Sequence, residues 1–183
     1  HRFCRYYLCT QLNVIIKNRI IIGMENQMFC FQCQETAKGT GCTVRGVCGK
    51  LPETSRWQDL LISVVRGLGT IGHALNEAGV SYDKQKAGDS IVDGLFACIT
   101  NANFDDDALL GRVDKVLALK RQLLDTAMAA KVLLPDYQEV KWGGEKADYL
   151  AEGNREGILR NTNADQRSLK ELTILGLKGM AAY

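Results

Sequence analysis

Proline is almost absent from this sequence of 183 residues, which contains only Pro52 and Pro135, and aromatic residues make up only 7% of it. Few prolines with abundant Leu, Ala, Lys and Gln favour helices over an architecture of strands and turns. The formal net charge of +2 is too small to indicate an acidic or a basic partner. The sequence also lacks a run of basic residues with interleaved aromatics, which argues against nucleic-acid binding.

Long apolar runs are lacking as well. The most apolar stretch near the start, residues 13–22, is interrupted by two basic residues and is too short to span a bilayer. It does not resemble a secretory signal, because no apolar block precedes a small-residue cleavage site. Met24 and Met28 are both candidate starts, so residues 1–27 are expected to be an upstream extension outside the fold. A membrane-associating segment at residues 1–23 is the rival interpretation.

Cysteine, in contrast, is plentiful, and four of the seven cysteines follow the pattern Cys30-x2-Cys33-x8-Cys42-x5-Cys48. The odd number, the clustering and the absence of a cleavable signal argue against a secreted disulfide scaffold. Metal binding in a reducing compartment, the cytoplasm, fits these features better. The other three cysteines are scattered along the chain: Cys4, Cys9 and Cys98.

The clustered cysteines have the number and the surroundings of a four-thiolate metal site. A Cys-x2-Cys pair can place both sulfurs on one centre, and two further cysteines complete four ligands for zinc or for an iron–sulfur cluster. Neighbouring glycines allow the backbone to take positive φ and to bring amide N–H groups to the sulfurs: Gly39, Gly41, Gly46 and Gly49. Zinc sites usually pair two Cys-x2-Cys knuckles, whereas this unequal spacing suits a loop around a larger cubane. Both metals stay open on spacing alone.

Apolar residues recur at helical spacing in the rest of the chain. Four helices are predicted. The first begins at Thr54 or Ser55 and ends at Gly79, and the second runs from about Asp89 to Ala102. The third begins at Asp105–Asp107 and ends at about Val132, and the fourth begins between Asn163 and Asp165 and runs to Tyr183. Residues 135–162 are broken by proline and glycine and are expected to be looser. The sequence therefore predicts a mainly α fold, in which a cysteine-rich cluster-binding loop at 28–51 precedes an antiparallel helix bundle over 52–183.

Three further features have structural interpretations. Cys98 lies on an apolar helix face and is expected to be a small core residue. His73 has no partner histidine or carboxylate motif, so a solvated or packed side chain is expected rather than a ligand. Asp105–Asp107 suits the positive end of a helix dipole better than a cation site. The last helix has no polar stop signal, which indicates a longer polypeptide.

The stretch from Met28 to Lys50, MFCFQCQETAKGTGCTVRGVCGK, closely resembles the N-terminus of the hybrid-cluster (prismane) protein family, also called hydroxylamine reductases. The resemblance continues through residues 58–61, 94–97, 99–103, 167–169 and 176–179, and it covers about residues 28–183. It implies that Cys30, Cys33, Cys42 and Cys48 bind one cluster, and their spacing is similar to that of the subgroup with a [4Fe–4S] cubane. A structural zinc-binding helical interaction module remains the alternative.

The resemblance also implies a function for the whole polypeptide. Members of the family reduce hydroxylamine to ammonia and water at a second, hybrid Fe–S–O cluster, and nitric oxide reduction is another activity ascribed to them. The His, Glu and Cys ligands of that hybrid cluster lie in later parts of a longer chain. The sequence is thus expected to be an electron-transfer segment with a redox donor as partner, inactive towards hydroxylamine alone, with a homodimer among the expected states.

Overall fold

The computed structural model describes residues 28–99 and 103–183, so the predicted extension over residues 1–27, with Cys4 and Cys9, lies outside the described residues. Within these described ranges, six α-helices follow the cysteine loop: α2 (Pro52–Glu77), α3 (Lys84–Ala97), α4 (Asp106–Ala129), α5 (Gln138–Lys141), α6 (Tyr149–Arg155) and α7 (Ala164–Ala181). Three short 3-10 segments accompany them: η1 (Ala37–Gly39), η2 (Lys146–Asp148) and η3 (Ile158–Arg160). The described residues contain no named strand, which confirms the predicted mainly α fold.

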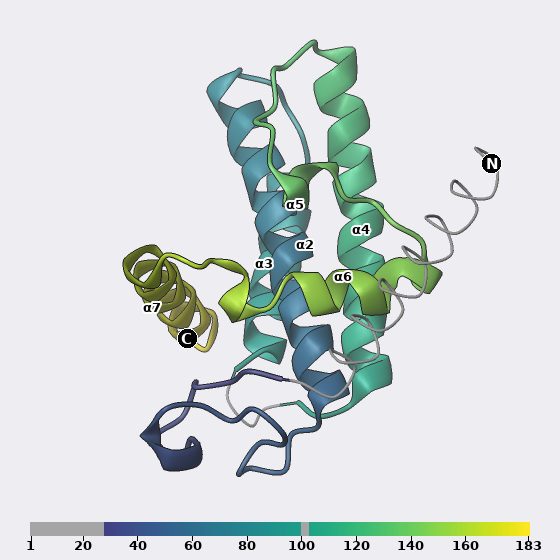
Figure 1. The fold of residues 1–183 in the computed structure, drawn as a ribbon. Coiled ribbons are helices and arrows are strands. Elements are labelled where there is room, and N and C mark those ends of the chain that lie inside the picture. Colours follow the sequence, from purple (N-terminus) through teal and green to yellow (C-terminus); the bar gives the residue numbers. More distant parts are fainter. Residues whose placement is uncertain (1–27, 100–102) are drawn as a thin grey trace, which may run out of the picture.

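Helices α2, α3 and α4 stand side by side, and each runs antiparallel to the one before it (Figure 1). The short helix α6 crosses α2 and α4, and α7 lies to one side, packed against α3. The cysteine loop lies at the base of the bundle, beside the start of α2. The short connections between long helices explain the antiparallel arrangement.

The starts of the helices follow ordinary capping rules. Asp105 accepts a hydrogen bond from the Ala108 amide at the start of α4, and Asn163 accepts one from the Gln166 amide at the start of α7. These two predicted starts are confirmed. The predicted start of α2 at Thr54 or Ser55 is wrong, because Pro52 already occupies the first helical position, where its fixed φ and missing N–H are tolerated.

One hydrophobic core joins α2, α3 and α4. Its fully buried members come mainly from α2 and α4 and include Leu60, Leu61, Leu68, Ile71, Leu75, Leu109, Val113 and Leu117. Each such side chain contributes about 1.5–3 kcal/mol by leaving water. The helical body therefore has its own source of stability, independent of the cysteine loop.

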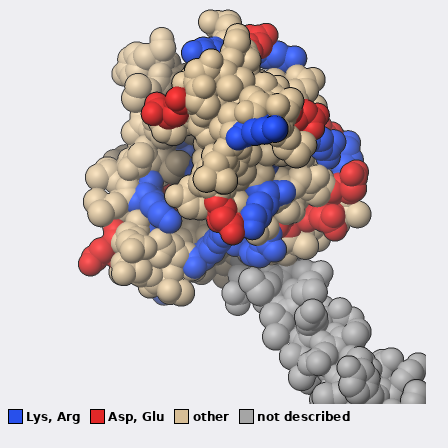
Figure 2. All heavy atoms as spheres, turned by 90° about the horizontal axis from the view of Figure 1, so that it is seen from above, with Lys and Arg blue, Asp and Glu red and all other residues tan. Residues whose placement is uncertain are grey.

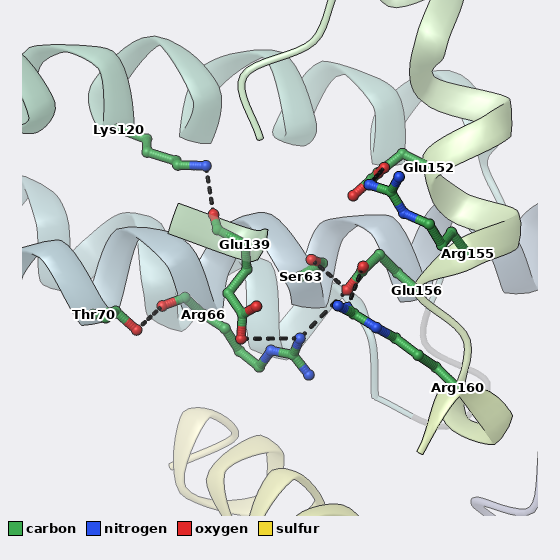
Figure 3. A network of polar contacts seen from close by, with 9 residues as sticks. All are labelled: Ser63, Arg66, Thr70, Lys120, Glu139, Glu152, Arg155, Glu156 and Arg160. Carbon is green, nitrogen blue, oxygen red and sulfur yellow. Dashed lines mark hydrogen bonds and ion pairs between the residues drawn. The ribbon is translucent and has the colours of Figure 1, made fainter. Parts of the chain in front are cut away.

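A network of polar contacts fixes α5, α6 and η3 onto α2 and α4 (Figure 3). The buried carboxylate of Glu156 accepts from the Ser63 hydroxyl at 2.8 Å and forms ion pairs with Arg66 and Arg160. On the other side of the network, the Lys120 ammonium donates to the backbone carbonyl of Glu139. These contacts hold the segment over residues 135–162, which the sequence predicts to be loose, in a defined path across the long helices.

The surface carries charges of both signs. On the face in Figure 2, Lys and Arg side chains are interspersed with Asp and Glu side chains. No helix among the described residues is both long enough and apolar enough to cross a membrane.

Candidate metal centre

The first and third clustered cysteines lie side by side. Cys30 and Cys42 form an isolated antiparallel bridge, in which the Cys30 amide donates to the Cys42 carbonyl at 3.1 Å and the Cys42 amide donates to the Cys30 carbonyl at 2.8 Å. The Met28 amide extends the pairing by donating to the Thr43 carbonyl at 3.2 Å. The chain between the two cysteines must therefore turn back on itself.

That turn is built around Thr36 and the 3-10 segment η1. The Thr36 amide donates to the Cys33 carbonyl at 3.2 Å, and its hydroxyl donates to the Cys30 carbonyl at 3.1 Å. Gly41 closes the turn with φ of +152°, and a Cβ at this position would lie 2.6 Å from the Phe29 ring. Only glycine fits there, which agrees with the predicted role of glycines in bringing the backbone close to the cysteines.

Amide groups point at the Cys42 sulfur. The Ala37 amide donates to Sγ at 3.5 Å, and the Thr36 hydroxyl lies 3.7 Å from it. The backbone N–H groups of Ala37 and Val47 hold the pKa of the Cys42 thiol below its usual value, against the effect of burial. The predicted donation of amide N–H groups to cysteine sulfur is therefore observed at this residue, and the thiolate is the form that binds metals.

The other three thiols have different surroundings. The ammonium of Lys50 lies 3.7 Å from Cys30 Sγ. Cys33 is partly buried and Cys48 is exposed, and a Cβ at Gly46 would lie 3.0 Å from Cys48 Sγ. None of the four is in a disulfide within the described residues, so all four are free thiols.

The described side chains do not form a site for a single metal ion. Within residues 28–99 and 103–183, no group of three or more His, Cys, Asp or Glu side chains is arranged to hold a single metal ion. A tetrahedral zinc needs four sulfurs about 2.3 Å from one ion, and a cubane binds each thiolate through its own iron. The free thiols, the amide N–H group at Cys42 and the glycine that closes the turn fit a group held by thiolates, and they suit either of the two.

The structure also locates the residues that were predicted not to be ligands. Cys98 is fully buried, its thiol donates to the Gln58 carbonyl at 3.7 Å, and burial raises its pKa to about 12. The prediction of a core cysteine is confirmed. His73 is exposed on α2, which agrees with a solvated histidine.

Sequence reasoning missed the polar side chains behind the cysteine loop. Lys50 and Gln58 are each 3% exposed, and Lys178 is 6% exposed. Lys50 donates to the Gln58 side-chain oxygen at 2.7 Å, and Lys178 donates to the Gln32 side-chain oxygen at 3.2 Å. A lysine in a sequence is normally taken for a surface residue, so only the position of Lys50, two residues after Cys48, was a usable signal.

A cavity of considerable size lies away from the cysteine loop. It has a volume of about 820 Å³, lies between α7, η3 and the residues around α5, and is lined by charged groups of both signs that include Arg66, Glu139, Glu156, Arg160 and Arg167. No clustered cysteine lines it. Its charges largely serve the contacts of Figure 3, so it provides no reason to move the candidate site away from the cysteine loop.

Comparison with known proteins gives a consistent result. The family described as "Prismane/CO dehydrogenase family" matches residues 28–183. A hydroxylamine reductase of Porphyromonas gingivalis is 47% identical over 160 residues, which cover 87% of this chain and 29% of that protein.

Two further relatives are also described as hydroxylamine reductases. The protein of Bacteroides fragilis is 47% identical over 156 residues, which cover 85% of this chain and 28% of that protein. The protein of Nitratidesulfovibrio vulgaris is 44% identical over 163 residues, which cover 85% of this chain and 29% of that protein. The chain thus spans under a third of the length of these relatives, and the resemblance that the sequence predicts is confirmed.

Proposed function

Since the chain belongs to the Prismane/CO dehydrogenase family, we propose that Cys30, Cys33, Cys42 and Cys48 hold a [4Fe–4S] cluster through which the protein transfers electrons. The observation that carries this proposal is the environment of Cys42. The Ala37 amide donates to Cys42 Sγ at 3.5 Å, and amide donors to sulfur stabilise thiolate ligands.

Different residues shape the loop and stabilise charge at this site. The Cys30–Cys42 bridge and the Thr36 hydroxyl fix the loop, and the Ala37 amide stabilises charge on sulfur. When bound, a cubane accepts and releases one electron at a time. The helical body presents the loop at one end, so the candidate site stands at the base of the bundle (Figure 1).

We propose that the loop at 28–51 binds the cluster and that the helical body at 52–183 supports the loop, both as parts of a longer enzyme of the hydroxylamine reductase type. Reduction of hydroxylamine to ammonia and water breaks the N–O bond and consumes two electrons and two protons. Nitric oxide is the second substrate we consider. The relatives are more than three times longer than the matched part, and we propose that the substrate reacts at a hybrid cluster in residues outside that part.

The donor of electrons is proposed to be a redox protein or small reductant, and free thiols fit a reducing compartment such as the cytoplasm. The proposed electron donor and the proposed reaction depend on the presence of the cluster, and its absence would contradict both.

The experiment is anaerobic purification of the chain followed by iron, sulfide and zinc analysis. We expect a brown protein with about four iron and four sulfide per chain, and loss of most of both in Cys33→Ser and Cys42→Ser. Cys98→Ser is the matched control, because it changes a buried cysteine outside the loop and is expected to keep the cluster. A colourless protein with about one zinc per chain would establish the alternative, a structural zinc-binding module.

A second arm tests the location of the chemistry. We expect no hydroxylamine turnover by the 183-residue chain with reduced viologen as donor, although the cluster itself should be reduced. Turnover by this chain would show that the substrate reacts on these residues.

A further inference from the structure

Two buried ammonium groups approach the turn between Cys30 and Cys33. The Lys50 ammonium lies 3.7 Å from Cys30 Sγ, and the Lys178 ammonium, which comes from α7, donates to the side chain of Gln32 at 3.2 Å. Gln32 lies between the two cysteines in sequence. Two positive charges from distant parts of the chain therefore meet one short turn.

Neither ammonium has a carboxylate partner at ion-pair distance among the described residues. Lys50 and Lys178 appear in no salt bridge, although they are only 3% and 6% exposed. Asp59 on α2 acts as a charge on both lysines, and Glu171 acts on Lys178, but neither carboxyl is at ion-pair distance from them. Burial raises the pKa of Asp59 to about 7, so its negative charge is only partly present at neutral pH. Two like charges buried with so little compensation are costly, so the arrangement calls for further negative charge nearby.

Gln58 holds the Lys50 ammonium in place. Its side-chain oxygen accepts from Lys50 at 2.7 Å, and its side-chain nitrogen donates to the Asn103 carbonyl at 3.2 Å. Gln58 itself is buried on α2. Because the amide is fixed at both ends, the ammonium is held between Gln58 and Cys30.

We propose that Lys50 and Lys178 are the charge-compensating residues of the cluster site, Lys50 at the Cys30 thiolate and Lys178 through Gln32. This inference rests on the proposed cluster at the four cysteines. An oxidised cubane with four thiolates carries a net charge of about −2, which two ammonium groups balance. Reduction adds one more negative charge, so both lysines favour the reduced form and raise the reduction potential.

The two lysines act by different routes. Lys50 touches a ligand sulfur and acts on the cluster directly, whereas Lys178 acts through Gln32 and is a positioning residue. Lys178 also connects α7 to the loop. The effect of Lys50 on the potential is therefore expected to be the larger of the two.

The test is a redox titration of the reconstituted chain, followed by absorbance and electron paramagnetic resonance. At the wild-type midpoint, we expect Lys50→Met to lower the ratio of reduced to oxidised cluster about tenfold, which is 59 mV for a one-electron couple. Lys178→Met should lower this ratio about threefold, which corresponds to about half of the 59 mV shift in midpoint potential. Lys50→Arg keeps the charge and should stay close to wild type.

Lys38→Met is the matched control, because it removes one positive charge from the same loop where the side chain is exposed to water. A change of less than about twofold is expected there, since water screens the charge. An equal change in Lys38→Met and Lys50→Met would overturn the proposal, because it would reflect net charge alone.

Iron and sulfide analysis distinguishes the absence of a cluster from the absence of an effect of the lysines. A wild-type chain without a cluster contradicts the proposed function itself. A wild-type chain with a cluster, whose potential is unchanged in Lys50→Met and Lys178→Met, contradicts only the role of the lysines. If Lys50→Met retains no cluster, the test rests on Lys178→Met and Lys50→Arg. A lowered potential in Lys178→Met together with a near-wild-type potential in Lys50→Arg supports the proposal. Any other pair of results overturns it.

Discussion

The cysteine loop and the helical body differ in what holds them together. In the loop, residues 28–51, the only buried apolar side chains described are those of Met28 and Cys42, while Val44 and Val47 are 75% and 60% exposed. The helical body buries a continuous apolar core between α2, α3 and α4. The loop relies on the Cys30–Cys42 bridge, on hydrogen bonds to carbonyls and sulfur, and on contacts from buried lysines.

This difference means that the two regions have separate stabilities. Burial of apolar surface is the dominant favourable term in folding, so the helical body should stay folded when the loop opens. The loop can be held only by polar contacts and by whatever its thiols bind, because it has almost no core. Binding of a cluster would then order the loop without changing the body.

The largest effect is expected from a cavity in the body. Leu68 on α2 is 0% exposed, and Leu68→Ala should lower the free energy of unfolding by about 2–5 kcal/mol. Chemical denaturation followed by circular dichroism measures this, with Leu169→Ala on the exposed side of α7 as the control. The folded protein should take up as much iron as wild type. A folded Leu68→Ala protein that loses its iron would show that the two regions are coupled.

A smaller effect is expected from pH, and again only on the body. Burial lowers the pKa of Lys120 from 10.5 to about 8, so between these values the unfolded chain binds more protons than the folded one. The free energy of unfolding should then rise with pH, by roughly 1 kcal/mol per pH unit between about pH 8 and 10.

Denaturation at several pH values, compared with Lys120→Met, isolates this contribution. The rise should be absent from the variant, which lacks the titrating group, and the variant should be less stable because two backbone carbonyls, those of Glu139 and Trp142, lose their donor. A parallel rise in both proteins would assign the pH dependence to other groups.

The helices could be predicted wherever their apolar face or their cap was visible in the sequence. The sequence predicts that α3 starts near Asp89, but it begins at Lys84, because its first turn is exposed and carries no apolar periodicity, while Asp83 supplies the cap. The sequence does not predict the short helices α5 and α6, since four and seven residues are too few to show a period. Their positions depend on contacts such as that of Lys120 with the Glu139 carbonyl.

The candidate site also has a part that the sequence predicts and a part that it does not. The four cysteines and their glycines are local in sequence, so their spacing was enough to predict a metal site. Lys178 is 146 residues from Gln32, and only the packing of α7 brings them together. Gln58 and Lys50 are buried as well, and Gln58 also contacts Asn103, which is 45 residues away in sequence. A contact of this kind depends on tertiary structure and leaves no pattern in a single sequence.

The smallest effect is expected from one hydroxyl in the loop. Thr36→Val removes the donor to the Cys30 carbonyl and the contact with Cys42 Sγ, a loss of about 0.5–1.5 kcal/mol. Hydrogen exchange of the Cys30 and Cys42 amides should accelerate about two- to tenfold, with no measurable change in the free energy of unfolding. Thr126→Val in α4, which loses only a bond to its own helix, should leave loop exchange unchanged. If Thr36→Val instead destabilised the body as much as a core cavity does, the separation of loop and body would be wrong.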